Sequence, residues 1–528
     1  MKKLFVYPIT YIIYITLLFA IGISLAFINQ DFIYISIIIS IILIIISIFL
    51  KNKYYISIMI LIFSCLFIGY SYTIIRYYDI FNNTLGKFDK EIEAYNAKIL
   101  SYDGVIGFRD RYIAYVDKIY DGTNWHNYCG NIRLYNNSLK PLFINDEITV
   151  SSKLNLYKNI LTNNNNNNNN EYDNEIIIKV LADRMLYGTA AIYQYNNFTV
   201  QKRGFSIFNK INYYSIKIRN IIKESLGANM EAIPYSIAQG IMIGDKNIIP
   251  YHIRKYFIDA GISHILSISG LHISMIISIL FLILSFFSLN FYKRILISSI
   301  TAIIIYPPIT LFSVSIMRAS IMALCLLISY YFDRNRNSIN ALFISALIIL
   351  ILNPNSIKDI SFQFSFLAAL GIIIYYPIFN FYIIRNLKNI KFNNIIKNIS
   401  VKLLSFLSIN IFALITVLPL SIHHFSILNL TSILANIFAV PLSFIILSSS
   451  LITVITYNIY KPLSIFPART VEFCSNLLIN TAYKLSRINF LKYNLSLNLY
   501  SAVFITFMIV FIGIIFRIII NKKSVSKK

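Results

Sequence analysis

The sequence predicts a polytopic α-helical membrane protein that carries a small extracytoplasmic β domain. Hydrophobic residues make up 57% of the 528-residue chain and charged residues only 13%, whereas soluble proteins are about 25% charged. Several uncharged segments reach the roughly 20 residues that a membrane-spanning helix needs. Between residues 76 and 200, by contrast, apolar and polar residues alternate with the period of two that is typical of half-buried strands.

Residues 1–75 are expected to form three transmembrane helices. Three stretches contain no Asp, Glu, Lys or Arg: 4–30, 32–50 and 54–75. The first is longer than the apolar core of a cleaved signal peptide, which runs to about 7–15 residues, so we expect it to remain in the mature protein. Because basic residues gather on the cytoplasmic side of a membrane, Lys2 and Lys3 predict a cytoplasmic N-terminus.

Residues 76–200 are predicted to form an extracytoplasmic β domain of the OB type, a small barrel. Stretches such as "RYIAYVDKIY" alternate in polarity, and "YDG" and "CGN" mark turns. OB folds hold single strands by stacking bases on aromatic rings, although aromatic side chains in a Tyr-rich chain more often belong to a core. Four aromatic residues are candidate stacking platforms: Tyr112, Tyr115, Tyr120 and Trp125.

Residues 201–259 are expected to form a helical connector in which apolar positions interleave with Lys and Arg. It is either an amphipathic helix at the membrane surface or an ordinary helix packed on the β domain. Residues 260–520 are predicted to hold about seven to nine membrane segments. The expected segments are 260–290, 295–315, 317–332, 339–353, 360–380, 403–422, 430–458 and 495–516. The basic tail 521–528 predicts a cytoplasmic C-terminus.

The net charge of +25 follows the apolar segments. Residues 76–235 hold 19 basic and 16 acidic residues, while the rest of the chain holds 28 and 6. The gathering of basic residues beside membrane helices accounts for most of this excess, so the charge alone does not indicate nucleic-acid binding. The four cysteines are scattered and form no CxxC pair, which argues against a thiolate metal site.

Polar residues inside the apolar block are the candidate functional residues. Such residues are costly in a spanning segment and usually face a bundle interior or a water-filled cavity. We expect the following residues to line a channel: His264, Ser269, Gly270, His272, Arg318, Asp359, Gln363 and Asn436. Two alternatives stay open. Arg318 and Asp359 could form a buried ion pair that registers two helices, and the histidines could be satisfied inside a packed bundle.

The stretch "HILSISGLHISM", residues 264–275, raises a question of chemistry. On one continuous helix His264, Ser269 and His272 would share a face; alternatively Gly270 and the serines unwind the helix, which a membrane tolerates only beside protein or water. Ser269 could also be a nucleophile with His272 as base. The "SISG" sequence departs from the GxSG of rhomboid-type intramembrane proteases, however, so we do not expect an enzyme.

Five segments resemble the ComEC family of competence proteins, which are membrane channels for uptake of transforming DNA. In order they are "QGIMIGDKNIIP" (239–250), "AGISHILSISGLHISM" (260–275), "MRASIMAL" (317–324), "NPNSIKDISFQFSFLAALGI" (353–372) and "LTSILANIFAVPL" (430–442). The second segment matches the family pattern G-x-x-H-x-x-x-x-S-G-x-H. The first 200 residues are similar to the N-terminal spans and external OB-like domain of that family.

The resemblance implies a channel in the bacterial cytoplasmic membrane through which single-stranded DNA passes inward. It also implies two partners besides DNA and membrane lipid: a separate DNA receptor and an ATP-driven motor protein, because the chain has no GxxxxGK[ST] loop. Many members carry a C-terminal metallo-β-lactamase-like domain with an HxHxDH-type metal site. The six histidines of this chain do not form that pattern, so we expect no metal, no cofactor and no nuclease activity. An intramembrane serine hydrolase using Ser269 and a transporter of another solute remain the alternatives.

Overall fold

The computed structural model describes most of the chain and divides it into two compact units. The described residues are 8–28, 32–49, 54–82, 85, 88, 90–106, 109–136, 142, 146–156, 186–192, 198–202, 207–245, 248–266, 268–331, 338–381, 394–488 and 492–525. The first unit comprises Met1–Asn220 and Leu347–Asp359, and the second comprises Ile221–Ala346 and Ile360–Lys528.

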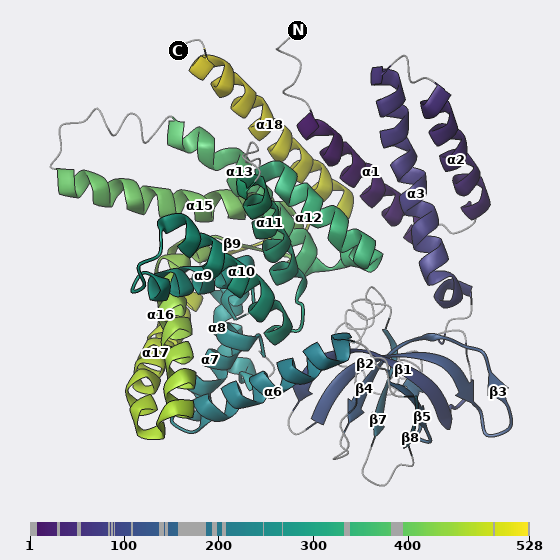
Figure 1. Ribbon diagram of the computed structural model, residues 1–528, viewed down its shortest axis with the longest axis horizontal. Helices are drawn as coiled ribbons and strands as arrows, with labels where there is room; N and C mark the ends of the chain where they lie inside the picture. The colour runs from purple at the N-terminus through teal and green to yellow at the C-terminus, as the bar shows by residue number, and fades with distance from the viewer. Residues whose placement is uncertain are drawn as a thin grey trace. The chain divides into compact units, whose positions relative to one another are not determined.

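Three apolar helices open the first unit (Figure 1). They are α1 (Pro8–Ile28), α2 (Ile33–Phe49) and α3 (Tyr54–Asn82). A Cβ added to Gly22 of α1 would clash with the carbonyl oxygen of Leu66 in α3, and one on Gly69 would clash with that of Phe19. The two glycines therefore let the backbones of α1 and α3 approach closely, as small residues do between membrane helices. Three helices are thus present where the sequence predicts three transmembrane helices; α1 and α3 contain segments long and apolar enough to span a membrane, and α2 contains a shorter apolar segment.

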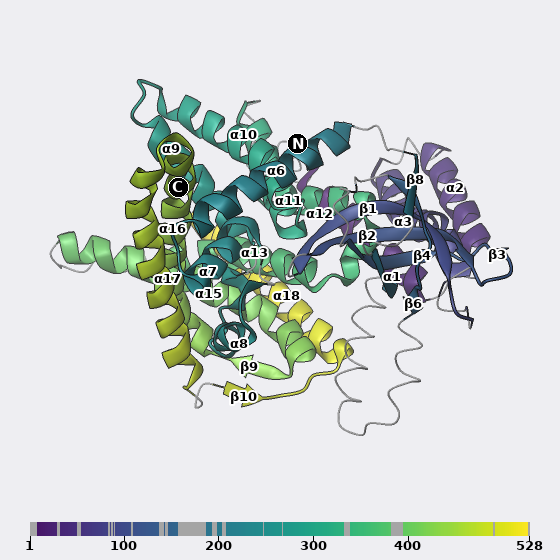
Figure 2. The same cartoon turned by 90° about the horizontal axis from the view of Figure 1, so that it is seen from below.

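A β sheet follows these helices in the first unit (Figure 2). Its strands are β1 (Ala94–Ile106), β2 (Arg109–Tyr120), β3 (Trp125–His126), β4 (Gly130–Asn136), β5 (Glu147–Val150), β6 (Asn155–Leu156), β7 (Leu186–Ile192) and β8 (Phe198–Lys202). The order is β6-β7-β4-β2-β1-β5-β8, with β3 paired to β2. Every pairing is antiparallel except that of β4 with β7. The expected β region is thus present.

The sheet buries one face, as its period of two requires. Residues 111–116 of β2 alternate between intermediate and buried, and β4 alternates in the same way over its whole length. The buried side chains of Ile99, Ile132 and Ile148 come from β1, β4 and β5 and meet in one apolar cluster. Because those three strands are separated in the chain, the cluster is a true tertiary core.

The chain from residue 207 onward is almost entirely helical. Its elements are α6 (Ile207–Gly227), α7 (Ala232–Ile243), α8 (Tyr251–Asp259), η3 (Ser263–Ile265), α9 (Gly270–Leu284), α10 (Phe291–Ile309), α11 (Val314–Tyr331), α12 (Ser338–Leu352), η4 (Pro354–Lys358), α13 (Ile360–Phe379), α15 (Asn394–Phe425), β9 (Ile427–Asn429), α16 (Thr431–Ile459), η6 (Lys461–Ser464), α17 (Ile465–Ser486), β10 (Lys492–Asn494) and α18 (Leu499–Val525). The α6 and α12 helices each cross the boundary between the units.

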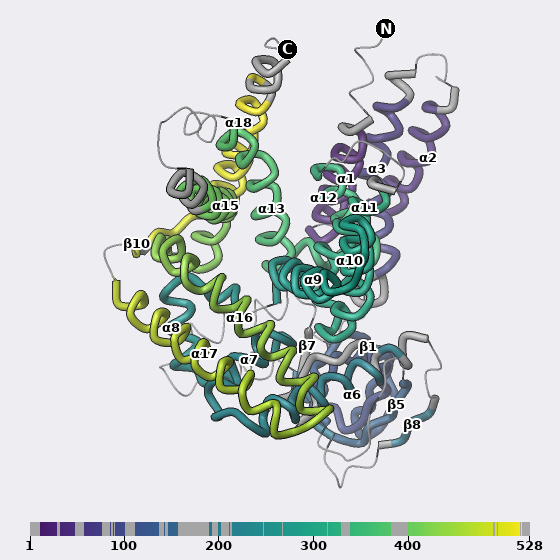
Figure 3. Tube along the Cα trace, turned by 60° about the vertical axis from the view of Figure 1, so that its left-hand side comes forward, coloured from purple at the N-terminus to yellow at the C-terminus, as the bar shows by residue number. Residues whose placement is uncertain are grey.

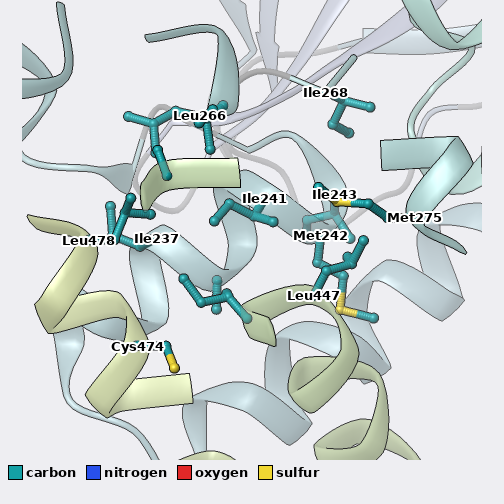
Figure 4. Packing of buried hydrophobic residues seen from close by; sticks show 14 of the residues in the cluster. Ile237, Ile241, Met242, Ile243, Leu266, Ile268, Met275, Leu447, Cys474 and Leu478 are labelled. Carbon is teal, nitrogen blue, oxygen red and sulfur yellow. The ribbon is translucent and has the colours of Figure 1, made fainter. Parts of the chain in front are cut away.

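The core of the second unit joins α7, η3, α9, α16 and α17. The side chains of Ile241, Leu266, Met275, Leu447 and Leu478 are all buried in one cluster (Figure 4). Helices α16 and α17 run side by side in the second unit (Figure 3). The motif segments around residues 240, 270 and 440 therefore belong to one packed body.

Six helices are long and apolar enough to cross a membrane among the residues that the structure describes. They are Tyr11–Ile28, Ile58–Arg76, Ile360–Phe379, Ser400–Phe425, Thr431–Ile459 and Leu499–Arg517. Helices α2, α9, α11 and α12 contribute shorter apolar stretches. The expected spans at 260–290 and 295–315 are wrong in extent, because the first is broken before α9 and α10 ends at Ile309. Of the basic residues used to orient the chain, Lys2, Lys3, Lys527 and Lys528 lie outside the described residues, whereas Lys522 and Lys523 belong to the end of α18.

Helix α17 is absent from the expected elements. It carries Arg469, Glu472 and Lys484, and these charges lower its hydropathy below that of a span. Glu472 is 7% exposed, and its carboxylate accepts hydrogen bonds from the backbone N–H of Glu231 at 2.9 Å and from Arg469 at 2.6 Å. The charged residues thus hold α17 against the start of α7, which composition alone does not reveal.

Candidate functional site

The segment 260–275 contains a break between two helices. Helix α8 ends at Asp259, a single 3-10 turn covers Ser263–Ile265, and α9 begins only at Gly270. His264 and His272 therefore do not share a face of one continuous helix. Of the two local conformations that the sequence allows, the unwound one is present.

Gly261 makes the first turn of this break. Its φ of +74° lies in the left-handed region, where only glycine is readily accommodated. The N–H of Ile262 donates to the Phe257 carbonyl and the N–H of Gly261 to that of Ile258, both at 2.9 Å. These two bonds form a Schellman motif. The motif glycine therefore ends α8 and redirects the chain toward η3.

Ser269 and His272 cap the N-terminus of α9. The Ser269 hydroxyl oxygen accepts from the Leu271 N–H at 3.3 Å, and the Ser269 N–H donates to His272 Nδ1 at 3.2 Å. The hydroxyl also lies 3.1 Å from the same Nδ1. This reciprocal arrangement is a capping box, with His in the position that Glu or Gln usually takes.

The capping box accounts for the proximity of Ser269 and His272 without catalysis. A catalytic base needs a group that orients its second nitrogen. His272 is 1% exposed, and its Nε2 has no hydrogen-bond partner among the described residues. The hydroxyl and the imidazole satisfy main-chain donors at the helix start, which is a structural role.

Replacement of Ser269 separates capping from nucleophilic chemistry. Ser269→Asn retains a capping oxygen and has no hydroxyl, so we expect normal folding and normal activity. Ser269→Ala removes the cap and should lower the free energy of unfolding by about 1 kcal/mol. Thermal unfolding of the purified protein in detergent measures the second effect. Complete loss of activity in Ser269→Asn at an unchanged protein level would instead identify a nucleophile.

His264 and Asn436 connect the break to α16. The imidazole of His264 lies beside the side chain of Asn436 and the main chain of Gly261. Asn436 is 8% exposed, and its Oδ1 has no hydrogen-bond partner among the described residues. Two candidate residues far apart in the sequence are thus in contact.

Arg318 of α11 lies against the first residue of α9. It is 9% exposed, and its guanidinium carbon is 5.7 Å from the centre of the Phe366 ring in α13. Its Nη2 lies 2.6 Å from the point that a Cβ of Gly270 would occupy. Nε has no hydrogen-bond partner, and the described residues of the second unit offer Arg318 no ion pair. Gly270 is therefore needed for this contact.

Gln363 pairs with a residue that the candidate set omits. Its Oε1 lies 3.3 Å from His424 Nε2 at the end of α15. The neighbouring His423 uses Nδ1 on the Leu497 carbonyl at 2.9 Å, and the two imidazole centres are 5.0 Å apart. Two adjacent histidines in an otherwise uncharged block were the available signal for this pair.

Asp359 belongs to the first unit. It follows η4, and its backbone N–H donates to the Ser356 carbonyl at 3.1 Å. The other seven candidates of the apolar block lie in the second unit.

The aromatic candidates of the β sheet fall into two groups. Tyr112 is 3% exposed and lies in the sheet core, so its proposed role as a stacking platform is wrong. Tyr115 is partly buried. Tyr120 and Trp125 pair across β2 and β3, with ring centres 5.4 Å apart, and Trp125 is 47% exposed. These two rings form the Tyr120–Trp125 platform, an aromatic surface at the tip of a hairpin.

Asp121 fixes the turn beside this platform. Its Oδ1 accepts from the N–H groups of Asn124 at 2.8 Å and Thr123 at 3.0 Å, and from the Thr123 hydroxyl at 2.7 Å. Its Oδ2 accepts from Lys90 Nζ and lies beside His126 Nε2, both at 3.0 Å. These bonds, the one from Asn124 first, hold the pKa of the Asp121 carboxyl well below its usual range.

The lowered pKa of Asp121 predicts that the hairpin beside it loses stability only in acid. Its contribution to stability is complete above the ordinary carboxyl pKa of about 4 and is lost as the pH falls further toward the lowered value. Trp125 is the single tryptophan of the chain, so its fluorescence should stay constant down to about pH 4 and change only below it. Asp121→Asn should abolish that acid transition. An acid transition that persists in Asp121→Asn would contradict this assignment.

The described residues contain no group of three or more His, Cys, Asp or Glu side chains that could hold a metal ion. Two arginines among the described residues are buried, Arg219 at 4% and Arg318 at 9% exposed, and only Arg318 lies in the second unit.

Comparison with known proteins shows a family match for residues 241–520, which include most of the second unit. The competence protein family, represented by its sequence model, matches residues 241–520, more than half of the chain. ComE operon protein 3 of Bacillus subtilis (strain 168) is 22% identical over 234 residues, which cover 43% of this chain and 27% of that protein. The match thus spans about a quarter of that relative's length, and no solved structure matches the chain. With its apolar helices and ordered motifs, this multi-pass membrane protein belongs to the competence protein family.

Proposed function

We propose that this protein forms a channel through which single-stranded DNA enters the cell across the bacterial cytoplasmic membrane. The observation that carries the proposal is the family match over residues 241–520, which is also the region where polar side chains gather among apolar helices. A strand carrying one charge per nucleotide cannot cross hydrocarbon unaided, and a bundle with polar side chains inside offers a path.

The polar side chains of the second unit are the proposed lining. His264 with Asn436, Gln363 with His424, and Arg318 come from separate helices that pack in one body. Such groups exchange hydrogen bonds with a passing strand without chemical change. We therefore propose a non-enzymatic role, with Ser269 and Gly270 shaping the start of α9 rather than reacting.

The β sheet is the proposed receiving domain. Strands β5 and β6 follow each other closely in the chain and pair with β1 and β7, at opposite ends of the β7-β4-β2-β1 series. This pairing brings the sheet back toward itself, as in a small barrel, and supports the OB-type interpretation. The Tyr120–Trp125 platform supplies stacking, while Lys90 supplies a nearby cation. We place this domain on the outer face of the membrane and both termini in the cytoplasm.

The proposed partners follow from the energy that directional movement of a strand requires. A channel needs a motor to move a strand in one direction, so we propose a separate ATP-driven motor protein inside and a DNA receptor outside, with lipid around the bundle. Serine hydrolysis and transport of another solute are the competing functions, and Ser269→Asn addresses the first.

Import of labelled single-stranded DNA is the direct test. Vesicles containing this chain and a motor from a transformable host should accumulate fluorescent oligonucleotide in an ATP-dependent manner, and vesicles without the chain should not. The control is a small anionic dye of similar charge, because its equal uptake would indicate a non-specific pore. Failure of import under conditions where another family member works would contradict the proposal.

The Tyr120–Trp125 platform gives a second test with a built-in probe. Added oligothymidylate should quench the fluorescence of Trp125, and Tyr120→Ala should weaken binding by about 5- to 150-fold, since stacking of one base contributes about 1–3 kcal/mol. Tyr112→Phe is the matched control, because Tyr112 is buried and should leave binding unchanged. Equal binding in Tyr120→Ala would exclude the platform from strand recognition.

A further inference from the structure

Arg318 and the N-terminus of α9 converge on the same place. An α-helix leaves its first N–H groups without intrahelical acceptors and has a partial positive charge at that end. Helix α9 is 15 residues long and starts at Gly270. The Arg318 guanidinium, 2.6 Å from the point that a Gly270 Cβ would occupy, therefore adds a full positive charge to a terminus that is already positive.

Burial of this cation is costly. Arg318 is 9% exposed, its Nε has no hydrogen-bond partner among the described residues, and the second unit provides no carboxylate against it in the described part of the chain. A buried cation without a partner loses much of its hydration energy. The Phe366 ring at 5.7 Å offsets part of that loss through a cation–π contact.

An anion would satisfy both positive groups at once. Helix N-termini bind phosphate and carboxylate through main-chain N–H groups, and the guanidinium fork matches two oxygens of a phosphate. Ser269 and His272 already use the N–H groups of Ser269 and Leu271, so the cap shapes this end of the helix and leaves Gly270 at the contact with Arg318.

We propose that Gly270, at the start of α9, and the Arg318 guanidinium form a binding site for the phosphodiester anion of a DNA strand. This inference rests on the proposed function, since a phosphodiester is the anion that a translocating strand presents at every step. Gly270 serves the site by having no side chain, because a Cβ would displace the guanidinium. The Phe366 ring, 5.7 Å from the guanidinium carbon, adds a cation–π contact to the same cation.

The first test uses inorganic phosphate and the full chain in phosphatidylcholine nanodiscs. Wild-type protein should melt at a higher temperature in phosphate than in chloride of equal ionic strength. Arg318→Gln should melt higher than wild type without phosphate, because the unpaired cation is gone, and should gain less from phosphate than wild type does, since only the general stabilisation by this salt remains. Arg517→Gln is the matched control, since Arg517 donates to the Ile373 carbonyl at 3.0 Å; its response to phosphate should persist. An equal response in Arg318→Gln would overturn the site.

The second test uses a labelled oligothymidylate and a Trp125→Ala background, which removes the stacking platform. Adding Arg318→Gln should weaken binding about tenfold or more, as expected for a charge-assisted hydrogen bond. Gly270→Ala should also weaken it although the charge is retained. A methylphosphonate backbone, which is uncharged, should bind weakly and be insensitive to both changes. Sensitivity equal to that of the phosphodiester would overturn the proposal.

Two further outcomes separate this inference from its alternatives. Nanodiscs containing phosphatidylglycerol should leave oligonucleotide binding in place; abolition of binding by that lipid would assign the site to lipid headgroups and overturn the strand assignment. Unchanged oligonucleotide affinity in Arg318→Gln together with normal vesicle import would contradict the Arg318 binding site and leave the proposed channel function in place. Binding that depends on Arg318 without any import would contradict the channel function and leave the binding site in place.

Discussion

Substitution of Gly261 by Ala is expected to lower the free energy of unfolding by about 2–5 kcal/mol, enough to reduce accumulation of folded protein sharply. Two costs add. Gly261 has a φ of +74°, which an L-residue with a side chain adopts at a penalty of about 1–2 kcal/mol. The new Cβ would also lie 2.7 Å from the Ser432 Cβ and 3.3 Å from the Asn429 side chain, and overpacking of this kind costs about 1–3 kcal/mol.

The destabilisation should extend to α16, because Gly261 lies against Asn429 and Ser432 at the start of that helix. Asn429 donates to the Asp259 carbonyl at 2.8 Å and accepts from the Thr431 N–H at 3.1 Å. A shift that relieves the clash would break one of these bonds. Gly227→Ala is the control, since Gly227 ends the α6 helix and its Cβ would meet only the Tyr235 ring at 3.3 Å.

Thermal unfolding followed by fluorescence-detected gel filtration compares the two alanine variants. We expect a large fall in melting temperature for Gly261→Ala and a small change for Gly227→Ala. Equal melting temperatures in Gly261→Ala and wild type would show that the left-handed turn is not required.

Breaking the ion pair between Lys223 and Asp245 is expected to cost about 3–5 kcal/mol, the second large effect. Lys223 Nζ of α6 lies 2.9 Å from Asp245 Oδ2, and the side chains are 20% and 2% exposed. Asp245 follows Gly244, whose φ of +77° ends α7. Asp245→Leu leaves a cation facing an apolar group, whereas Lys223→Met leaves a buried carboxylate, which should cost more.

A double-mutant cycle tests this pair. The variant with both Lys223→Met and Asp245→Leu should be more stable than either single variant, because neither charge is left alone. The Lys153–Glu91 pair at 2.6 Å is the comparison; its side chains are 60% and 75% exposed, so its coupling should be below about 1 kcal/mol. Additive effects at Lys223 and Asp245 would mean that the pair does not stabilise the fold.

The Gly-Asp, Gly-His and Ser-Gly-His motifs thus acquire structural roles. Gly244 and Gly261 end helices in the left-handed conformation, Asp245 anchors α7 to α6, and Ser269 with His272 starts α9. A sequence motif that suggests catalysis can instead set the direction of the chain at a helix end, because the backbone N–H groups there also need hydrogen-bond partners.

The sequence by itself determined the membrane class, the three N-terminal helices, the β region and the family resemblance. Uncharged runs and period-two alternation are local patterns that hydrophobic burial imposes whatever the fold. It did not predict α17, whose Arg469 and Glu472 lower its hydropathy, and it did not separate the buried Tyr112 from the exposed Trp125.

Only the tertiary structure showed that Arg318 lies against Gly270, His264 against Asn436 and Gln363 against His424. Those residues are 48, 172 and 61 positions apart in the sequence, and their meeting depends on which helix faces pack together. Helix packing is set by the summed shape of many side chains. A single sequence records the residues that can pair, and the fold selects the pairs.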